Sequence, residues 1–246
     1  MIQVLNKGYV RYIDHLGTDL SVVNAARASF KKESDWEYSE EMVDQSRILE
    51  FVPRLKEADR KLINYLAKHN HGSPFRHCYV TLEIKAPIII ARQIFKHVIG
   101  VASIEEGTNW NEASYRYVTA EPEFYIPSSW RSAPENKKQG SGEPVGEELT
   151  ENLNALLHST IKMCMDRYEL AVKHGVCIEQ ARGFLPANFQ YTTWRWTASL
   201  QAIAHFCNLR LGKDAQSETT EYAKVIYDIV EPLFPVSMEA LCNEVS

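Results

Sequence analysis

The chain has 246 residues, of which 45% are hydrophobic and 24% are charged, and its formal net charge at pH 7 is −5. This length suits one substantial domain with its own core, and the composition is typical of a soluble globular protein. The acidic balance disfavours a broad face for a nucleic-acid polymer, although a locally basic pocket can still hold a phosphate group.

The sequence also disfavours the membrane-bound and secreted classes of protein. Its longest apolar run, residues 86–91, is far shorter than the roughly 20 residues that span a bilayer. The first seven residues lack the basic and apolar regions of a secretory signal. Five cysteines, at positions 78, 164, 177, 207 and 242, form no CxxC pair, which favours reduced thiols. We therefore expect a cytoplasmic protein that binds no membrane.

The first half of the chain contains both helix and strand patterns. Capping residues and apolar periodicity predict helices at residues 19–26, 57–69 and 87–97, the last with Pro87 in its first turn. Alternation of apolar and polar side chains predicts strands at residues 10–14 and 78–85. Residues 48–52 fit either a helix or a strand.

The second half is dominated by helix patterns. Residues 132–148 are rich in Pro, Gly, Ser, Lys and Glu and predict an exposed loop. A long helix is predicted from residue 149 to 171, with Gly175 as its stop, and further helices at residues 178–183, 196–211 and 215–230. Together the elements predict a mixed α/β protein of the α+β class. It is helix-rich, with a small, mainly antiparallel sheet, in one domain spanning residues 1–246.

Three histidines cluster in the segment from His69 to His77, which joins a predicted helix to a predicted strand. Their spacing across a Gly-Ser-Pro turn matches no standard zinc pattern. The residue types alone favour a polar turn with histidines bonded to the backbone over a metal site. A turn in which His71 and Ser73 face a phosphate or a ring remains an alternative.

A second cluster lies on the helix predicted at residues 87–97. Gln93, Lys96 and His97 share one polar edge with Arg92 close by. This edge fits an anion site and, equally well, a solvated face. Further on, an extended segment would place Glu112, Ser114 and Arg116 on one side. Two further cations, Arg182 and Arg210, each fit a surface charge or a helix-end charge when taken alone.

In their order and spacing, these clusters resemble the flavin-dependent thymidylate synthases. The resemblance runs through most of the chain and rests on five groups: Lys7-Gly-Tyr-Val to Ser29-Phe30, His71-Gly-Ser-Pro-Phe-Arg-His77, Arg92-Gln93 to Arg116-Tyr117, Phe124-Tyr-Ile-Pro127, and Ala181-Arg182 with Asn208-Leu-Arg210 and Ala215-Gln216. It implies the fold of that family. It also implies the methylation of dUMP to dTMP, with methylenetetrahydrofolate as carbon donor and FAD reduced by NADPH as hydride donor.

The resemblance also implies roles for single residues and an assembly, a homotetramer with FAD across the subunit interface. The residues expected to bind dUMP are Gln93, Glu112, Ser114, Arg116, Arg182 and Arg210. Of these, Arg182 is the leading phosphate ligand, and Arg210 is the catalytic residue at the uracil ring. The residues expected to contact FAD are Ser29, His71, Ser73, Lys96, His97, Glu112, Ser199 and His205. No metal is implied.

The sequence departs from the family in one motif. The family's Arg-His-Arg followed by Ser reads Lys96-His97-Val98 here, and fifteen residues, 99–113, precede Ser114. Lys keeps the charge but loses the planar fork of Arg, and residues 99–110 form an insertion. Three alternatives therefore stay open: a deoxyuridylate hydroxymethylase of the same fold, a non-catalytic flavin- or nucleotide-binding relative, and a metal-dependent hydrolase built on the histidine turn.

Overall fold

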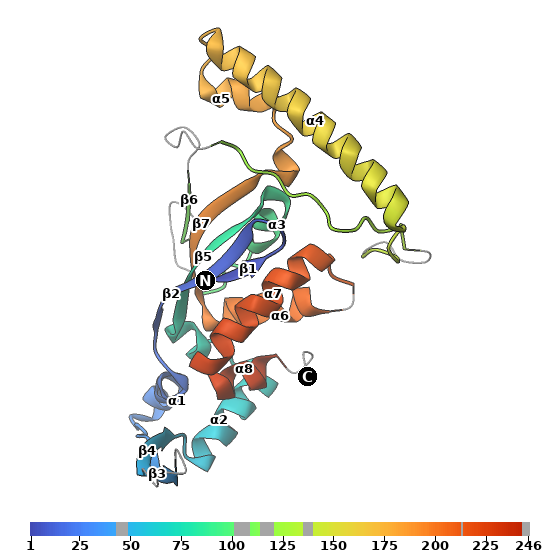
Figure 1. Cartoon of the computed structure of the whole chain (residues 1–246). Coiled ribbons are helices and arrows are strands. Elements are labelled where there is room, and N and C mark those ends of the chain that lie inside the picture. Colours follow the sequence, from blue (N-terminus) through green and yellow to red (C-terminus); the bar gives the residue numbers. More distant parts are fainter. Residues whose placement is uncertain (43–48, 101–108, 114–120, 135–139, 213, 243–246) are drawn as a thin grey trace.

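The computed structural model describes residues 1–42, 49–100, 109–113, 121–134, 140–212 and 214–242 (Figure 1). Five strands form one antiparallel sheet in the order β1-β2-β5-β7-β6. These strands are β1 (Ile2–Val4), β2 (Gly8–Leu16), β5 (Tyr79–Pro87), β7 (Tyr191–Ser199) and β6 (Trp110–Glu112). A separate hairpin pairs β3 (Glu37–Met42) with β4 (Leu49–Arg54). The predicted helix-rich fold with a small antiparallel sheet is confirmed.

Strands β5 and β7 pack against the core because buried apolar side chains alternate along them with polar ones. On β5, Val80, Leu82 and Ile84 are buried, and they lie opposite Ala198, Trp196 and Trp194 of β7 in the register. The intervening positions are polar, as in the pair Thr81–Thr197, whose hydroxyl oxygens lie 2.9 Å apart. One face of the sheet therefore forms the core, and the other carries polar groups.

Helices α3 (Ile88–Ile94), α6 (Leu200–Leu211) and α7 (Ser217–Val230) pack against strands of the sheet. Helices α1 (Asp19–Arg27), α2 (Glu57–Lys68) and α8 (Pro235–Leu241) pack on one another, and α8 also packs against α6. They share one hydrophobic cluster with the sheet, in which α6 buries Ala202, Ile203, Phe206 and Cys207. No helix of the described residues is both long and apolar enough to cross a membrane.

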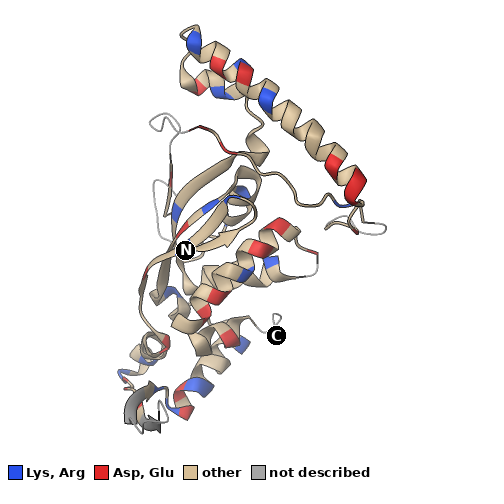
Figure 2. Cartoon of the chain, in the orientation of Figure 1, with Lys and Arg blue, Asp and Glu red and all other residues tan. Residues whose placement is uncertain are grey.

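Two other helices, α4 (Glu147–Lys173) and α5 (Ile178–Ala181), form an arm that extends away from the sheet (Figure 1). Thr150 is the one residue of the 27-residue α4 that the chain buries. Leu149, Leu156, Met163 and Leu170 are each 46–64% exposed, and they recur every seven residues. Figure 2 shows few charges along the middle of α4. We call these four residues the α4 stripe.

The predictions for the long, periodic segments hold. The helix predicted at residues 57–69 corresponds to α2, and the one at 149–171 lies within α4. The strand predicted at 10–14 lies within β2, and the one at 78–85 overlaps β5 from residue 79 onwards. The ambiguous residues 48–52 belong mainly to β4. Of the predicted loop, residues 147 and 148 are already in α4.

Two predicted helix boundaries are wrong. The helix predicted at 196–211 starts at Leu200, because the preceding residues continue the aromatic and β-branched alternation of β7 and Ser199 caps the helix by accepting from the Ala202 amide at 3.1 Å. The helix predicted at 87–97 covers only Ile88–Ile94, because Pro87 is extended and ends β5. Strands β1, β3, β6 and β7 and helix α8 were not predicted at all.

A buried carboxylate joins the two ends of the chain. Asp19 is 3% exposed, and its oxygens accept hydrogen bonds from the amides of Val236, at 2.9 Å, and Ser237, at 3.0 Å. These amides belong to the first turn of α8, where backbone donors lack partners within the helix. Asp19 therefore caps α8 from a distant part of the sequence.

We expect Asp19→Ala to lower the free energy of unfolding by about 1–3 kcal/mol, because two buried amides lose their acceptor. Asp19→Asn should be intermediate, since its one carbonyl oxygen accepts while its amino group cannot. Urea unfolding checks this, with the exposed Asp35→Ala as control. Equal stability of Asp19→Ala and the control would contradict the capping role.

Candidate functional site

A cavity of about 710 Å³ opens between α3 and the second half of α6. Its lining consists of the polar edge of α3, the residues that follow this helix, and one side of α6: Arg92, Gln93, Lys96, His97, Ile99, His205, Leu209 and Arg210. This volume is in the range of small-molecule sites.

The charged side chains that line the cavity are all positive. Arg92, Lys96 and Arg210 are cations, and no Asp or Glu lines the cavity among the described residues. Apolar Ile99 and Leu209 complete the walls, and low-dielectric walls strengthen the attraction of an anion. The arrangement therefore fits an anionic ligand.

A second cavity, of about 740 Å³, lies beside the β3–β4 hairpin. Its walls combine Asp19, Glu37 and Glu57 with Arg54 and Arg60. Charges of both signs give this cavity no preference for an anion or a cation, so the cavity beside α3 is the better candidate.

His97 is the most buried polar group of the candidate cavity. It is 5% exposed, its ring lies 5.5 Å from that of His205 and 5.1 Å from that of Phe206, and its Nδ1 has no partner among the described residues. Burial, with the nearby charges of His205 and Arg210, lowers the pKa of His97 to about 4. The ring is therefore neutral at pH 7 and can both donate and accept a hydrogen bond.

Arg210 presents a second unsatisfied group. Its Nε is buried without a partner among the described residues, while its carbonyl accepts from the Thr220 hydroxyl at 2.8 Å. Buried polar groups normally find partners, and an unpaired one costs free energy. Two such groups at one cationic cavity fit a ligand that supplies the missing bonds.

Local sequence explains why these side chains face the cavity. On α3, Ile90, Ala91 and Ile94 are buried in the core, so the residues between and after them turn outward. On α6, Phe206 and Cys207 are buried, which leaves His205, Leu209 and Arg210 on the other side. The predicted polar edge of Gln93, Lys96 and His97 is thus confirmed as one surface.

The histidine turn packs beside the start of α6. Arg76 Nε donates to Gln201 Oε1 at 2.7 Å, and a Cβ on Gly72 would lie 2.3 Å from Gln201 Nε2, so a larger residue there would require the Gln201 side chain to move. His71 is exposed, with its ring 6.4 Å from that of His69. Within the described residues, no group of three or more His, Cys, Asp or Glu could hold a metal ion.

Several predicted residues lie outside the cavity lining of one chain. Ser29 is exposed in the short helix η1 (Ala28–Phe30), and Arg182 begins the short helix η3 (Arg182–Phe184), which packs against α4. His71 and Ser73 lie in the turn. Ser199 is fully buried, and its hydroxyl donates to the Ile99 carbonyl at 2.5 Å.

The segment around Glu112 is described in part. Glu112 lies on the edge strand β6, where Oε1 accepts from the Thr192 hydroxyl at 2.5 Å. Ser114 and Arg116, as well as residues 101–108 of the predicted insertion, lie outside the described residues. The expected grouping of Glu112, Ser114 and Arg116 therefore stays a prediction.

The chain thus brings together five predicted residues: Gln93, Lys96, His97, His205 and Arg210. Arg92, which was predicted to lie close to the polar edge, also lines the cavity, as do Ile99 and Leu209. For Arg92, its place four residues before Lys96 was a usable signal. Ile99 and Leu209 are ordinary apolar residues with no such signal.

The model of the thymidylate synthase complementing protein family matches residues 11–236. A flavin-dependent thymidylate synthase of Thermosipho africanus is 34% identical over 238 residues, covering 97% of this chain and 92% of the relative. One of Thermus thermophilus is 36% identical over 239 residues, covering 97% and 77%, respectively. One of Thermotoga neapolitana is also 36% identical, covering 97% and 93%.

Among solved structures, the chain is similar to a UMP/dUMP methylase, PolB from Streptomyces cacaoi. The structure bound with 5-Br dUMP has a TM-score of 0.76 at 25% identity and covers 98% of this chain and 97% of that one. The structure bound with 5-Br UMP has a TM-score of 0.75 at 24% identity, covers 99% and 97%, and supports the fold alone.

The neutral state of His97 predicts a pH dependence of stability. Below pH 6.5 the unfolded chain takes up a proton at His97, whereas the folded protein does so only near pH 4. The stability from the neutral ring is therefore present above pH 6.5 and lost as the pH falls towards 4, by up to about 1.4 kcal/mol per pH unit.

As the pH falls from 6.5 to 4, we expect the free energy of unfolding to decrease less for His97→Gln than for the unchanged protein, because Gln takes up no proton. Urea unfolding at a series of pH values measures the difference, with the exposed His158→Gln as control. Parallel curves for His97→Gln and the unchanged protein would show that His97 is charged in the folded state.

Proposed function

The chain belongs to the thymidylate synthase complementing protein family, and we infer that it acts as a flavin-dependent thymidylate synthase, a methyltransferase that converts dUMP to dTMP. The observation that supports this most directly is the cationic cavity, which holds Gln93 and Arg210 of the nucleotide set and Lys96, His97 and His205 of the flavin set. A nucleotide supplies both a phosphate for the cations and a ring for the apolar walls.

For dUMP, we assign Arg210 to the uracil ring. Its Nε is buried, and apolar Leu209 lines the same cavity. Negative charge builds on the ring amide as carbon 5 becomes nucleophilic, and a fixed guanidinium in a dry site stabilises that charge. Gln93 contacts the nucleotide from α3. The other residues assigned to dUMP are Ser114, Arg116, Arg182 and Glu112. Of these, Arg182 binds the phosphate, and Glu112 lies at the edge of the nucleotide site.

For FAD, the residues at the cavity fit the group. Lys96 offers a positive charge, and His97 and His205 offer ring nitrogens, one of them the unpartnered Nδ1 of His97. Ser29, His71, Ser73, Glu112 and Ser199 are the other candidates to hold it. When bound, FAD supplies the hydride, while methylenetetrahydrofolate provides the carbon and NADPH the reducing equivalents.

We propose a homotetramer, in which α4 packs against another copy of the chain. The seven-residue recurrence of the α4 stripe is the spacing of helices that pack side by side. The resemblance also places Ser29 and Arg182 in the active site, although neither lines the cavity of its own chain. A site shared between subunits accommodates both observations.

Product analysis tests the function. The purified protein is incubated with methylenetetrahydrofolate, NADPH and either dUMP or UMP, and the products are separated by chromatography. We expect dTMP from dUMP. The hydroxymethyl product would assign the hydroxymethylase reaction instead, and no product from a flavin-saturated protein would overturn the enzymatic function.

We expect Arg210→Ala to fold and keep its flavin but to lose methylation by about 10²–10³, the usual loss for one preorganised donor at a developing anion. A residue that only caps α6 would contribute roughly 0.3–1 kcal/mol to stability and nothing to turnover. Arg210→Lys should restore part of the rate, because a point charge cannot replace the planar fork. Arg60→Ala, at a half-exposed arginine, is the control. Near-normal turnover of Arg210→Ala removes this residue from the mechanism.

We also expect Leu156→Glu to convert the tetramer into smaller species, because a carboxylate in an apolar helix contact is desolvated without a partner. Light scattering after size-exclusion chromatography measures the mass. His158→Glu puts the same charge on the opposite, exposed side of α4 and should leave the tetramer intact. An unchanged mass for Leu156→Glu would mean that the stripe is not the contact.

A further inference from the structure

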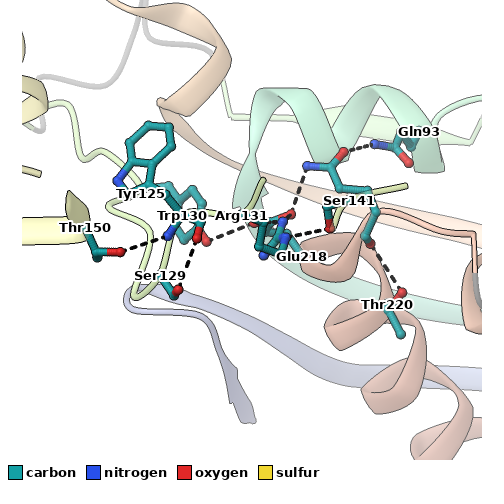
Figure 3. Close-up of polar contacts among 10 residues, drawn as sticks. Gln93, Tyr125, Ser129, Trp130, Arg131, Ser141, Thr150, Glu218 and Thr220 are labelled. Atoms are coloured by element: carbon teal, nitrogen blue, oxygen red, sulfur yellow. Dashed lines mark hydrogen bonds and ion pairs between the residues drawn. The ribbon is translucent and has the colours of Figure 1, made fainter. Parts of the chain in front are cut away.

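A chain of hydrogen bonds runs from the cavity to the start of α7 (Figure 3). Gln93 Nε2 donates to Gln216 Oε1 at 2.8 Å, and Gln216 Nε2 donates to Glu218 Oε2 at 3.1 Å. Gln93 lines the cavity, whereas Gln216 and Glu218 do not. The orientation of the Gln216 side chain and the charge of Glu218 therefore affect the cavity through Gln93.

Glu218 is fixed in its ionised form. It is 7% exposed, and Arg131 Nη2 donates to both of its oxygens, at 2.6 and 2.8 Å. The Tyr125 hydroxyl adds a third bond at 3.3 Å. Burial opposes the charge, but the hydrogen bonds from Arg131 leave the pKa of Glu218 below its ordinary value. Figure 3 shows Arg131 and Glu218 side by side.

An ionised carboxylate only accepts hydrogen bonds, whereas a carboxamide has a donor end and an acceptor end. Glu218 therefore turns the amino group of Gln216 towards itself, which turns the Gln216 carbonyl towards Gln93. Gln93 in turn donates a hydrogen bond from its own amino group to the Gln216 carbonyl oxygen. Its carbonyl oxygen then remains to accept a bond from a ligand, since no described residue donates to it.

This orientation matters because the cavity is otherwise rich in donors. Arg92, Lys96 and Arg210 can only donate hydrogen bonds. The doubly ionised phosphate group of a nucleotide would satisfy these three and gain nothing from an added acceptor. A nucleotide also has donors of its own, in its sugar hydroxyl and its ring N–H, and an acceptor in the wall would recognise them.

We propose that Gln216 is a positioning residue for nucleotide recognition: oriented by the Arg131–Glu218 ion pair, it makes Gln93 present a hydrogen-bond acceptor to a donor group of the nucleotide. The proposal rests on the function inferred above. The first turn of α7 also contacts α6, which forms the opposite wall of the cavity, because the Thr220 hydroxyl donates to the Arg210 carbonyl.

A double-mutant cycle tests whether Gln216 acts through Gln93. Binding of dUMP to the flavin-loaded protein is measured by equilibrium dialysis. Gln216→Ala should weaken binding about five- to tenfold, the loss expected when one hydrogen bond to the ligand is disordered. In the Gln93→Ala background, the same change should have no further effect. An equal loss in both backgrounds overturns the proposal. Glu221→Gln, at an exposed position on the same helix, is the control.

Nucleotide analogues identify the donor that Gln93 recognises. A 3′-deoxy analogue of dUMP lacks the sugar hydroxyl, and an N3-methyl analogue lacks the ring N–H. The analogue without the recognised donor should bind about five- to tenfold more weakly than dUMP to the unchanged protein, and as well as dUMP to Gln216→Ala. If neither analogue behaves in this way, the recognition role is overturned.

Exchanging the donor and acceptor ends of the hydrogen-bond chain from Gln93 through Gln216 to Glu218 tests this chain without any nucleotide. In the unchanged protein, Glu218→Gln should lower the melting temperature, because Arg131 loses its charged partner. Gln93→Glu can only accept, so it must turn the Gln216 carbonyl towards position 218. There the native carboxylate repels this carbonyl, whereas the carboxamide introduced by Glu218→Gln would donate to it.

Glu218→Gln should therefore lower the melting temperature less in the Gln93→Glu background than in the unchanged protein, since the loss of the Arg131 ion pair is common to both. An equal decrease in both backgrounds overturns the hydrogen-bond chain, whereas failure of dUMP to bind with unequal decreases overturns the proposed function alone.

Discussion

The pairing of β5 with β7 is the constraint on which the site depends. The register places Tyr79 opposite Ser199 and Pro87 opposite Tyr191, so the two strands end at opposite edges of the pair. Each strand is followed at once by a helix, α3 after Pro87 and α6 after Ser199. The two helices therefore start from opposite ends and meet through their later residues, where His97 lies against Phe206. A slip of one residue in this register would turn Trp194 and Trp196 out of the core and separate the walls of the cavity.

The chemistry of the cavity points to positioning rather than to covalent catalysis. The cavity lining in the described chain contains none of the five cysteines. Burial raises the pKa of Cys78 and of Cys242 to about 12, and that of Cys207 well above its ordinary value, so these thiols are poor nucleophiles. What the cavity offers instead is positive charge beside a neutral imidazole. Cations gathered in a partly dry site repel one another, so an anionic ligand there stabilises the folded protein as well as binding to it.

Local patterns in the sequence were sufficient for some of the site and insufficient for the rest. The polar edge of Gln93, Lys96 and His97 was predicted from helical spacing, and these residues do line one cavity, although α3 ends at Ile94. The contact between Gln93 and Gln216 joins residues 123 positions apart, and no periodicity reports on such a pair. Strand β7 was not predicted, although Thr193 and Arg195 alternate with buried residues, because its second half was assigned to the helix predicted at 196–211. Five of the residues assigned by resemblance meet in one cavity, whereas Ser29 and Arg182 lie apart, since sequence similarity does not say which subunit supplies a residue.

On the proposed function, the position of Arg182 would link assembly to catalysis. This residue begins η3, which packs against α4, so it moves with the same arm that exposes the α4 stripe. On the proposed tetramer, burial of the stripe against another copy fixes the arm, and the arm then fixes Arg182. The apolar contact would thus position a cation that does not line the cavity of its own chain. The long exposed helix, which adds little to the core of one subunit, is then the element that completes the active site of another.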